Sequence, residues 1–525
     1  MSVIVDLIRR SVSLSRNRQL QSMFAGDDIS GWWEMHRKNI IENWYFYRGL
    51  HSGFLKRFPG EDDQTYYTRI KDATIENHIK PIINLMVSHL YKDDKVKRYV
   101  LRDGKPDEEL NKILFENVWA HNHLSLDDNK ALNTFVTGYT ILQRKFIDIR
   151  TDKPFPLGAT NSDKLKYGII KKEPLDSSIA IPVPEIDENG IMDPTRVGAV
   201  IYVADHDNYV GSDMIMSLLK RQFTKKTVVE YVDSNVWLKW VRNQNEENWT
   251  QITVNPGTQF VNRNQYGDIY VPFSFYRNTG DPFYVEGDSE VDDMKGLNME
   301  LNELGNADKE VIQYHSNPVL MGLNGAKLPS DFIRTKNACV EIEKKDSKFE
   351  YLVWEGKLEE SRERQESIRR ALTLVTGISL ISRGFLKEIG QIRSGPPLKA
   401  LFSSDRSVMS RKFKCFHDCE VQDMKADVLF YQYNSGVNLN YDKKVTFNIK
   451  FEDDFLGIDA LLDAEIKTLQ TQSNTKSIAE IMREEHPDWS EKDINSAIDE
   501  MSKMMKKMQP KQMTSSPDKK GMEQE

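Results

Sequence analysis

The hydrophobic and polar positions in the middle of this chain repeat at helical intervals. Between residues 287 and 315, apolar side chains recur at spacings of three, four and seven, which places them on one stripe of a helix. A helix of this length would extend roughly 40 Å, which is longer than a compact α/β domain needs. A second stripe carries asparagines four residues apart. The apolar stripe is Val291, Met294, Leu297, Leu301, Leu304 and Val311, and the polar stripe is Asn298, Asn302 and Asn306.

An ordered succession of elements is predicted after this helix. Residues 317–354 form a short β-like insert, which on its own would be assigned as a hairpin. Residues 356–377 predict a second helix with a charged first half and an apolar second half, and Gly377 fits its C-cap. A glycine-containing loop at 379–397 then leads into a long third helix at 398–434.

The N-terminal part of the chain is predicted to be helical and rich in aromatic residues. Between residues 79 and 90, apolar positions follow helical spacing, and Pro81 fits the first turn. Residues 127–144 predict another helix, which passes through Gly138 into an apolar segment.

The period changes to that of strands between about residues 148 and 278. Segments rich in β-branched and aromatic residues are separated there by Asn, Gly, Asp and Pro, with hairpins expected around Asn235 and at 243–248. A further strand is predicted at 444–451 and helices at 457–507. Together these elements predict the α+β class.

Composition narrows the functional classes. The chain has 525 residues, enough for several sub-domains, and a net charge of −8, so no overall positive field attracts nucleic acid. Three cysteines do not provide a disulfide framework. No apolar run is long enough to span a bilayer, so we expect no membrane partner. The basic N-terminus lacks the apolar core and cleavage site of a signal peptide.

Familiar catalytic motifs are missing from the sequence. It has no P-loop, since the run GLNGAK has the wrong spacing, and no Gly-x-Ser-x-Gly elbow, HExxH pair or dinucleotide-binding fingerprint. We therefore expect no enzyme activity, no catalytic residue and no cofactor. If the function of this chain requires ATP hydrolysis, a partner protein has to supply it.

Two clusters of side chains contain residue types that can bind a metal ion. The acids Asp288, Glu290, Asp292 and Asp293 do not follow the spacing of an EF-hand, and carboxylates at a helix start are favoured by the helix dipole. Cys415, His417 and Cys419 lack a second ligand pair for zinc. We expect no metal at either cluster.

Several segments resemble the portal proteins of tailed bacteriophages of the siphovirus and myovirus type. NHIKPII, which follows Tyr47-Arg48-Gly49, is similar to their N-terminal wing helix, and VPFSFYRN is like the entry to their stem. RSGPPLKAL resembles the junction between their tunnel loop and a long helix, and QTQSNTKSIAEIMREEHPDW looks like the start of a crown helix. The resemblance covers most of residues 30–500 as an order of elements, and the individual motifs are short.

The resemblance implies a portal fold with an α/β wing, a two-helix stem, a small α/β clip, a tunnel loop followed by a long wing helix, and an α-helical crown. The implied divisions are an N-terminal basic arm at 1–30, the wing at 31–280 with its β-rich part at 148–278, stem helix 1 at 281–316, the clip at 317–355, stem helix 2 at 356–377, the tunnel loop at 378–397, the wing helix and strand at 398–455, the crown at 456–507 and a disordered tail at 508–525.

The same resemblance implies a function and partners. Such proteins form a ring, here expected to be a homo-oligomeric dodecamer, at one capsid vertex, and double-stranded viral DNA passes through it during packaging and ejection. The implied partners are the terminase large subunit, a head-completion or adaptor protein, and the major capsid and scaffolding proteins. The implied location is the virion, after synthesis in the host cytoplasm.

Candidate site residues follow from charge within these divisions. Acids on the first stem helix would line the channel and repel phosphates, so that DNA slides, or else they form an ordinary solvated helix face. The channel candidates are Asp292, Glu300, Glu303 and Asp308. Contacts from the tunnel loop to DNA are expected from Arg383, Phe385, Lys387 and Arg393. The clip would dock partners through Lys327, Arg334 and Lys336.

Two other functions remain open from the sequence. One is a metal-dependent nucleic-acid-processing enzyme that uses the acidic cluster around Asp292 and Asp293. The other is a different oligomeric capsid or adaptor protein, which only ring stoichiometry and a through-channel would distinguish from a portal.

Overall fold

The structure is a computed structural model in which the chain divides into two compact units. The first contains Met1–Lys92, His123–Lys145 and Lys172–Asp423, and the second contains Asp93–Asn122, Phe146–Lys171 and Met424–Glu525. The described residues are 29–91, 96–122, 125–156, 158–186, 192–209, 223–233, 237–243, 250–252, 273–280, 285–316, 319–323, 348–352, 358–379, 403–439, 444–451, 477–485, 489 and 491–508.

The first unit contains a five-stranded antiparallel sheet in the order β10-β9-β8-β7-β6. Both hairpins expected from the sequence are confirmed, since Val232 pairs with Trp237 and Val241 pairs with Thr250. The strands are β6 (Ala180–Ile186), β7 (Met192–Tyr209), β8 (Phe223–Asp233), β9 (Trp237–Asn243) and β10 (Thr250–Ile252).

One hydrophobic core joins this sheet to helix α3 (Ile29–Arg48) and to the strand pair β3 (Tyr139–Asp148) and β11 (Phe273–Arg277). β11 runs antiparallel to β3. Every residue of β11 is buried, as expected for a strand covered on both faces. The buried core residues are Ile40, Tyr139, Ile141, Ala180, Val200, Val232, Phe273, Phe275 and Val285.

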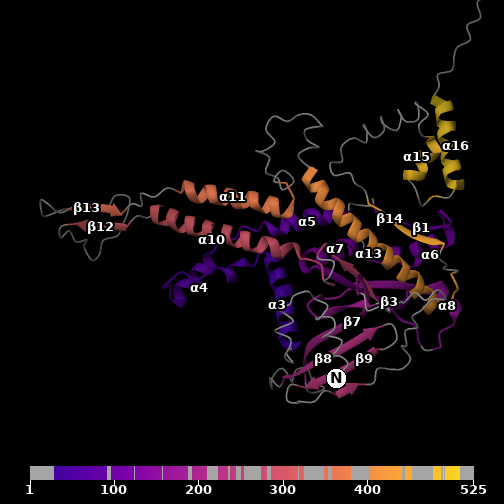
Figure 1. Cartoon of the computed structure of the whole chain (residues 1–525), viewed down its shortest axis with the longest axis horizontal. Coiled ribbons are helices and arrows are strands. Elements are labelled where there is room, and N and C mark those ends of the chain that lie inside the picture. Colours follow the sequence, from indigo (N-terminus) through magenta and orange to yellow (C-terminus); the bar gives the residue numbers. More distant parts are fainter. Residues whose placement is uncertain are drawn as a thin grey trace, which may run out of the picture. The chain divides into compact units, whose positions relative to one another are not determined.

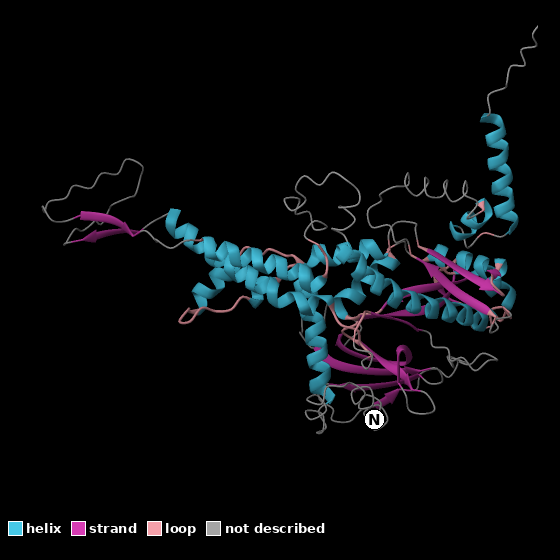
Figure 2. Cartoon of the chain, turned by 45° about the horizontal axis from the view of Figure 1, so that its top comes forward, coloured by secondary structure: helices cyan, strands magenta, loops and turns pink. Residues whose placement is uncertain are grey.

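Two long helices lie side by side in the first unit, as Figures 1 and 2 show. They are α10 (Glu290–Ser316) and α11 (Glu359–Thr376), and both were predicted from the sequence. Gly377 caps α11 in the left-handed conformation at φ 68°, as predicted. The strands β12 (Val319–Leu323) and β13 (Lys348–Leu352) between them pair antiparallel, which confirms the β-like insert.

The remaining helices of the first unit surround α10. α3, α5 and α7 each contact α10, and α5 has the buried face that its apolar spacing predicted. The third long helix, α13, ends one residue later than predicted, before Gly436 at φ 73°. The bounds are η1 (His51–Phe54), α4 (Asp63–Asp72), α5 (Ile79–Leu90), α7 (Leu126–Thr137) and α13 (Ser403–Ser435).

The predicted helix over residues 127–144 is wrong in its second half. α7 ends at Thr137, Gly138 adopts φ 90°, and the following apolar segment is strand β3. A Cβ on Gly138 would lie 2.1 Å from the carbonyl oxygen of Gly287, so only glycine fits this crossing of two backbones. The glycine therefore ends the helix, and the β-branched and aromatic residues after it continue as a strand.

The second unit is a smaller α/β assembly that contains the end of α13. Its three-stranded sheet has the order β14-β1-β2, and β14 confirms the strand predicted near residue 444. Its elements are β1 (Lys97–Arg102), β2 (Lys105–Pro106), α6 (Glu108–Asn117), η2 (Trp119–His121), β4 (Lys153–Pro154), α8 (Asn161–Tyr167), the start of β5 (Gly168–Pro174), β14 (Val445–Lys450), α15 (Ile478–Glu485) and α16 (Glu491–Met508).

The two units confirm the α+β class. α15 lies within the span of 457–507 predicted for C-terminal helices, and α16 ends one residue beyond it. Among the helices that the structure describes, none combines the length and the apolar character required to cross a membrane.

Candidate functional site

The candidate site is the pair of helices α10 and α11 together with the contacts that hold it. The two helices run in opposite directions, because β12 leaves the end of α10 and β13 leads into α11. Glu300 forms an ion pair with Arg364 at 2.7 Å, and Gln365 donates to Asp308 at 2.7 Å. An exposed ion pair contributes under about 1 kcal/mol, so apolar burial supplies most of the stabilisation. The buried apolar residues of α11 are Ile368 and Leu372.

The asparagine stripe of α10 binds an extended backbone segment, residues 73–78. Asn306 accepts from the Thr74 amide at 2.9 Å and donates to the Thr74 carbonyl at 2.9 Å. Asn302 accepts from the Glu76 amide at 2.8 Å, and Asn298 accepts from the His78 amide at 2.9 Å. Asn298 also donates to the Glu76 carbonyl at 3.0 Å.

The spacing of these bonds follows from the two backbone geometries. Four residues of an α-helix rise about 6 Å, and two residues of extended chain span about 6.6 Å. One asparagine per helical turn therefore meets every second residue of the segment. Because all three asparagines are buried, their amides replace water as partners for the segment's backbone.

His51 connects the asparagine stripe to the N-terminal helices. Its Nδ1 lies 3.1 Å from Nδ2 of Asn298 and 3.0 Å from Nδ2 of Asn302, and its Nε2 lies 2.7 Å from the Phe46 carbonyl. Two donors facing Nδ1 require it to be an acceptor, so the ring is neutral with its proton on Nε2. Burial of the ring lowers the pKa of His51, which keeps it neutral.

Glu76 connects the segment to α11. Its carboxylate accepts from His78 at 2.6 Å and from Arg369 of α11 at 3.1 Å. The hydrogen bond from His78, together with the bond from Arg369, lowers the pKa of Glu76 to about 2 against the opposing effect of burial. The extended segment is thus bound to both long helices.

The start of α10 is fixed by a buried lysine from α13. Lys412 donates to Asn278 at 3.0 Å and to Thr279 at 3.3 Å, and it forms an ion pair with Glu290, the first residue of α10. Asn278 in turn donates to the Asp288 carbonyl at 2.6 Å. A carboxylate at a helix start is favoured by the helix dipole, and here it also holds α13 against α10.

A second buried ionic group lies further along α13. Asp423 accepts from Arg144 at 2.5 Å, Lys172 at 2.7 Å and Tyr276 at 2.7 Å. Burial acts to raise the pKa of Asp423, but the charges of Lys172 and Arg144 hold it well below its usual range. The carboxylate is therefore ionised and ties α13 to the strands beside it.

The predicted channel acids all have contacts within the chain. Glu300 and Asp308 contact α11, as described above. Asp292 pairs with Lys295 at 2.9 Å, and Glu303 lies 4.0 Å from Lys56. The predicted loop and clip residues lie outside the described residues. The loop and clip residues are Arg383, Phe385, Lys387, Arg393, Lys327, Arg334 and Lys336.

The side chains of the two clusters considered above as metal sites contact other groups of the protein instead. Glu290 is bound to Lys412 and Asp292 to Lys295, so these carboxylates face cations of the protein. Cys415 Sγ lies 3.1 Å from the Arg277 carbonyl, and Cys419 is buried. Within the described part of the chain, no group of three or more His, Cys, Asp or Glu side chains is placed to hold a metal ion.

Sequence reasoning identified the asparagine stripe but not its partner. The four-residue spacing was visible, whereas the segment that it binds lies more than 200 residues away in the chain. His51, Lys412 and Asp423 were missed because isolated polar residues carry no pattern.

Comparison with known proteins does not establish the family or the function of this chain. No protein-family model matches the chain, and no curated protein matches it. Among solved structures, a chain of the virion of the native gene transfer agent (GTA) particle is similar at a TM-score of 0.37 and 10% identity. That match covers 82% of this chain and 94% of the other. A similarity at this level establishes neither a shared family nor a shared function.

Proposed function

We propose that this chain is the subunit of a viral portal, a ring at one capsid vertex through which double-stranded DNA is packaged and ejected. The observation that carries the proposal is the pair α10 and α11, joined through the β12–β13 pair and followed by the long helix α13. This order of elements is the one that a stem, clip and wing helix require. In this proposal α10 and α11 form the stem, and β12 and β13 belong to the clip.

The contacts of α10 suit a stem that keeps its position while DNA moves past it. The asparagine stripe fixes one side of α10, α11 covers another, and Lys412 holds its start. A helix of 27 residues is about 40 Å long and would be stiff when held at three places. The passage of DNA would then not displace α10, which forms part of the wall of the proposed channel.

The charge of α10 suits a surface that DNA touches weakly. The helix has seven acidic and two basic residues. Each phosphate contact made by a basic side chain strengthens DNA binding, so an acidic wall favours sliding. Asp292, Glu300, Glu303 and Asp308 are proposed to contribute this charge, although their partners within the chain reduce the free charge that each presents.

The remaining partners follow from the proposed role. Lys327, Arg334 and Lys336 would dock the terminase large subunit and later a head-completion or adaptor protein. Arg383, Phe385, Lys387 and Arg393 would contact DNA inside the channel. The wing and crown would face the major capsid and scaffolding proteins, and the protein would reside in the virion.

A mass measurement tests the ring. Light scattering of the purified chain, coupled to size exclusion, should give one closed species of about twelve copies, because a head-to-tail interface forms a ring when its rotation closes. A dimer, or an open series of sizes, would contradict the proposal. The nuclease alternative is separated by Asp292→Asn combined with Asp293→Asn. A portal has no metal-dependent DNA cleavage to lose in that variant.

A further inference from the structure

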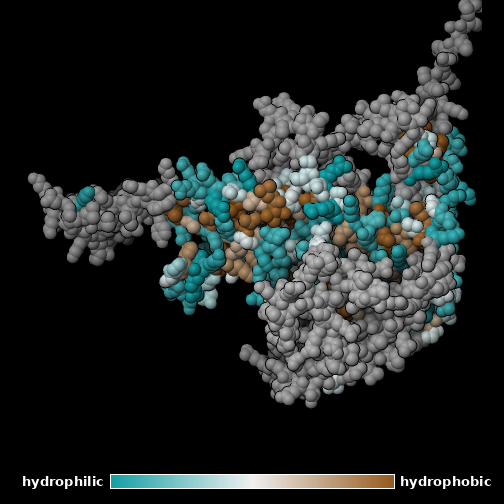
Figure 3. Space-filling model, viewed as in Figure 1, coloured by the Kyte–Doolittle hydropathy of each residue, from teal (hydrophilic) through white to brown (hydrophobic). Residues whose placement is uncertain are grey.

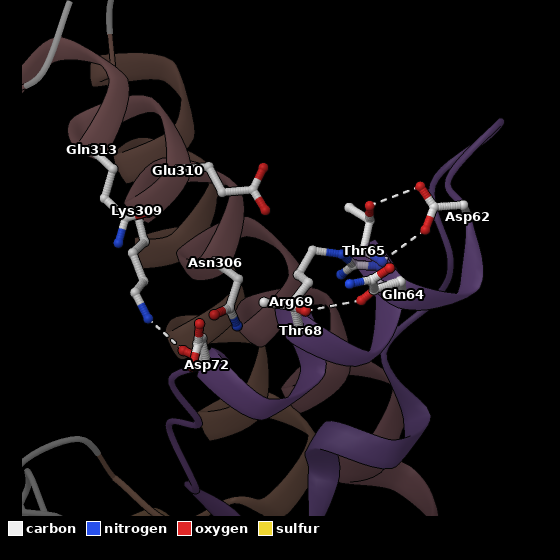
Figure 4. Close-up of a pocket in the computed structure, with 10 residues that line it drawn as sticks. All are labelled: Asp62, Gln64, Thr65, Thr68, Arg69, Asp72, Asn306, Lys309, Glu310 and Gln313. Carbon is white, nitrogen blue, oxygen red and sulfur yellow. Dashed lines mark hydrogen bonds between the residues drawn. The ribbon is translucent and has the colours of Figure 1, made fainter.

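The extended segment 73–78 is held to α10 by polar contacts at its two ends. The first end follows α4, which buries none of its residues, and Figure 3 shows mostly hydrophilic residues where Figure 1 places α4. Asn306 binds the segment there. Beside it, Lys309 donates to the carbonyl oxygen of Asp72 at a polar pocket of about 410 Å³ that α4 and α10 line (Figure 4). The second end, at residues 76–78, is held by a different group of side chains.

Two asparagines hold the second end, and both also bind one histidine. Oδ1 of Asn298 accepts from the amide of His78, and its Nδ2 donates to Nδ1 of His51 at 3.1 Å. In the same way, Oδ1 of Asn302 accepts from the Glu76 amide, and its Nδ2 donates to the same ring nitrogen at 3.0 Å. The ring nitrogen thus fixes both side-chain amides in the orientation that presents their oxygens to the segment.

A second proton on His51 is incompatible with this orientation. Nε2 already carries a proton, which it donates to the Phe46 carbonyl, so a second proton would bind Nδ1. Nδ1 would then be a donor that faces two further donors. Turning the side-chain amide of Asn298 or Asn302 by 180° gives Nδ1 an acceptor, but it points an NH2 group at a backbone amide of the segment. Protonation of His51 is therefore coupled to the loss of at least one bond that holds residues 76–78.

The structure keeps His51 neutral while the segment is bound. Burial of the ring lowers the pKa of His51, and the bond to the Phe46 carbonyl acts in the opposite direction. His51 forms no ion pair with any of the described residues, because the charged groups on the elements around it are engaged elsewhere. These groups are Glu42 of α3 with Lys295 of α10, Lys56 with Glu303 of α10, Glu76 with His78 and with Arg369 of α11, and Lys80 of α5 over the ring of Tyr47.

We propose that His51 is the proton-sensing residue of a latch, and that its protonation releases residues 76–78 from α10 while Asn306 keeps the first end of the segment bound. In the released state Nδ1 has an acceptor, so the ring binds a proton more readily than in the latched state. Release is therefore favoured as the pH falls below about 6.5, the ordinary pKa of histidine.

Release has a consequence for the long helices. Glu76 provides the bond from the segment to Arg369 of α11, so the opened latch loosens the connection that the segment makes between α10 and α11. The inference concerns the conformation of one chain, and it holds whether or not the chain assembles into a ring.

Hydrogen exchange tests the latch, read by mass spectrometry with fragmentation that resolves single amides. The quantity compared is the protection factor at pH 7.5 and at pH 5.0, with the intrinsic pH dependence of exchange removed. At the amides of Glu76 and His78 it should fall at least about threefold, since one linked proton changes an equilibrium by at most about tenfold per pH unit. At the Thr74 amide, which binds Asn306, it should change less than about twofold. No fall at Glu76 and His78, or an equal fall at Thr74, would overturn the latch.

Three variants identify the residue that takes up the proton. His51→Asn and His51→Gln do not titrate, and each has a side-chain oxygen that can accept from the two asparagines, so protection at residues 76 and 78 should lose its pH dependence in both. Using both variants keeps the test valid if one of them packs poorly. His78→Gln is the matched control, because His78 is the histidine of the segment itself and bonds to Glu76. It should retain the wild-type pH dependence. Loss of that dependence in His78→Gln, or its persistence in both His51 variants, would contradict the proposal.

Discussion

Asn306 holds the backbone of Thr74 by both of its polar groups, accepting from its amide and donating to its carbonyl at 2.9 Å each. Asparagine usually disfavours helix interiors because its side chain competes for backbone partners. In α10 the Asn306 amide group does donate to the Asn302 carbonyl of its own helix at 2.8 Å, but its other two hydrogen bonds go to a different part of the chain. The helix thereby gains a lateral contact that resembles one rung of a β-ladder.

The first prediction concerns this contact. Asn306→Ala leaves the amide and carbonyl of Thr74 without partners, so the free energy of unfolding should fall by about 2 kcal/mol. Urea denaturation measures the loss, and hydrogen exchange should become faster at the Thr74 amide. Asn129→Ala, on the exposed face of α7, serves as the control and should change stability little. Equal losses in both variants would show that the asparagine stripe has no special role.

The second prediction concerns pH. Burial lowers the pKa of His51 below 6.5, so the unfolded chain binds a proton more readily than the folded chain. The stabilisation by neutral His51 is therefore complete above pH 6.5 and is lost as the pH falls below it. His36 acts in the same direction because burial lowers its pKa too.

His51→Gln tests this expectation, because glutamine does not titrate. The free energy of unfolding should depend less on pH between 6.5 and 5 in this variant than in wild type, measured by urea denaturation at several pH values. The remaining slope is expected from His36. Glu76 should add a separate loss only at lower pH, between about 4.5 and 2, because its pKa is lowered to about 2. An unchanged slope in His51→Gln would rule out the neutral-ring account.

The third prediction concerns the buried carboxylate of α13. Asp423→Asn removes the negative charge that faces the two buried cations Arg144 and Lys172. Breaking such a buried pair costs about 3–5 kcal/mol. Chemical denaturation should record that loss. Asp418→Asn, an exposed carboxylate on the same helix, should cost under about 0.5 kcal/mol.

The fourth prediction concerns the proposed tunnel loop. Replacing Lys387 and Arg393 with Ala should leave the ring assembled and change DNA packaging or retention, since these side chains are proposed to contact the DNA backbone. Particle mass tests the first part and the amount of encapsidated DNA tests the second. Loss of the ring in this variant would assign the loop a structural role instead.

The sequence predicted elements better than it predicted contacts. The apolar stripe located α10 to within a few residues, and Gly377 correctly marked the end of α11. Gly138 was misjudged because a glycine inside an apolar run is compatible with a continuing helix. Gly138 ends the helix in the left-handed conformation, and the Gly287 backbone, which is far away in the sequence and close in space, leaves no room for a Cβ there.

The contacts of the site were harder to predict, because they too join residues that are far apart in the sequence. Asp423, Arg144 and Lys172 come from three separate stretches, and each alone has the appearance of a surface charge. The same holds for Lys412, whose partner Glu290 was predicted only as an acid at a helix start. Local sequence patterns indicate the periodicity of helices and strands and the residues at which they end. The ion pairs of Asp423 and Lys412 depend instead on how these elements pack against one another.

The measurement that tests the account most directly is electron microscopy of the purified, assembled protein in end-on view. A portal requires closed rings with a central hole of roughly 20 Å or more, wide enough for a DNA duplex, and that is the result we predict. Assemblies with no hole, or persistent monomers and dimers at high concentration, would contradict the proposal that the protein forms a channel for DNA. They would instead favour a different oligomeric capsid or adaptor protein, or the acidic cluster around Asp292 as an active site.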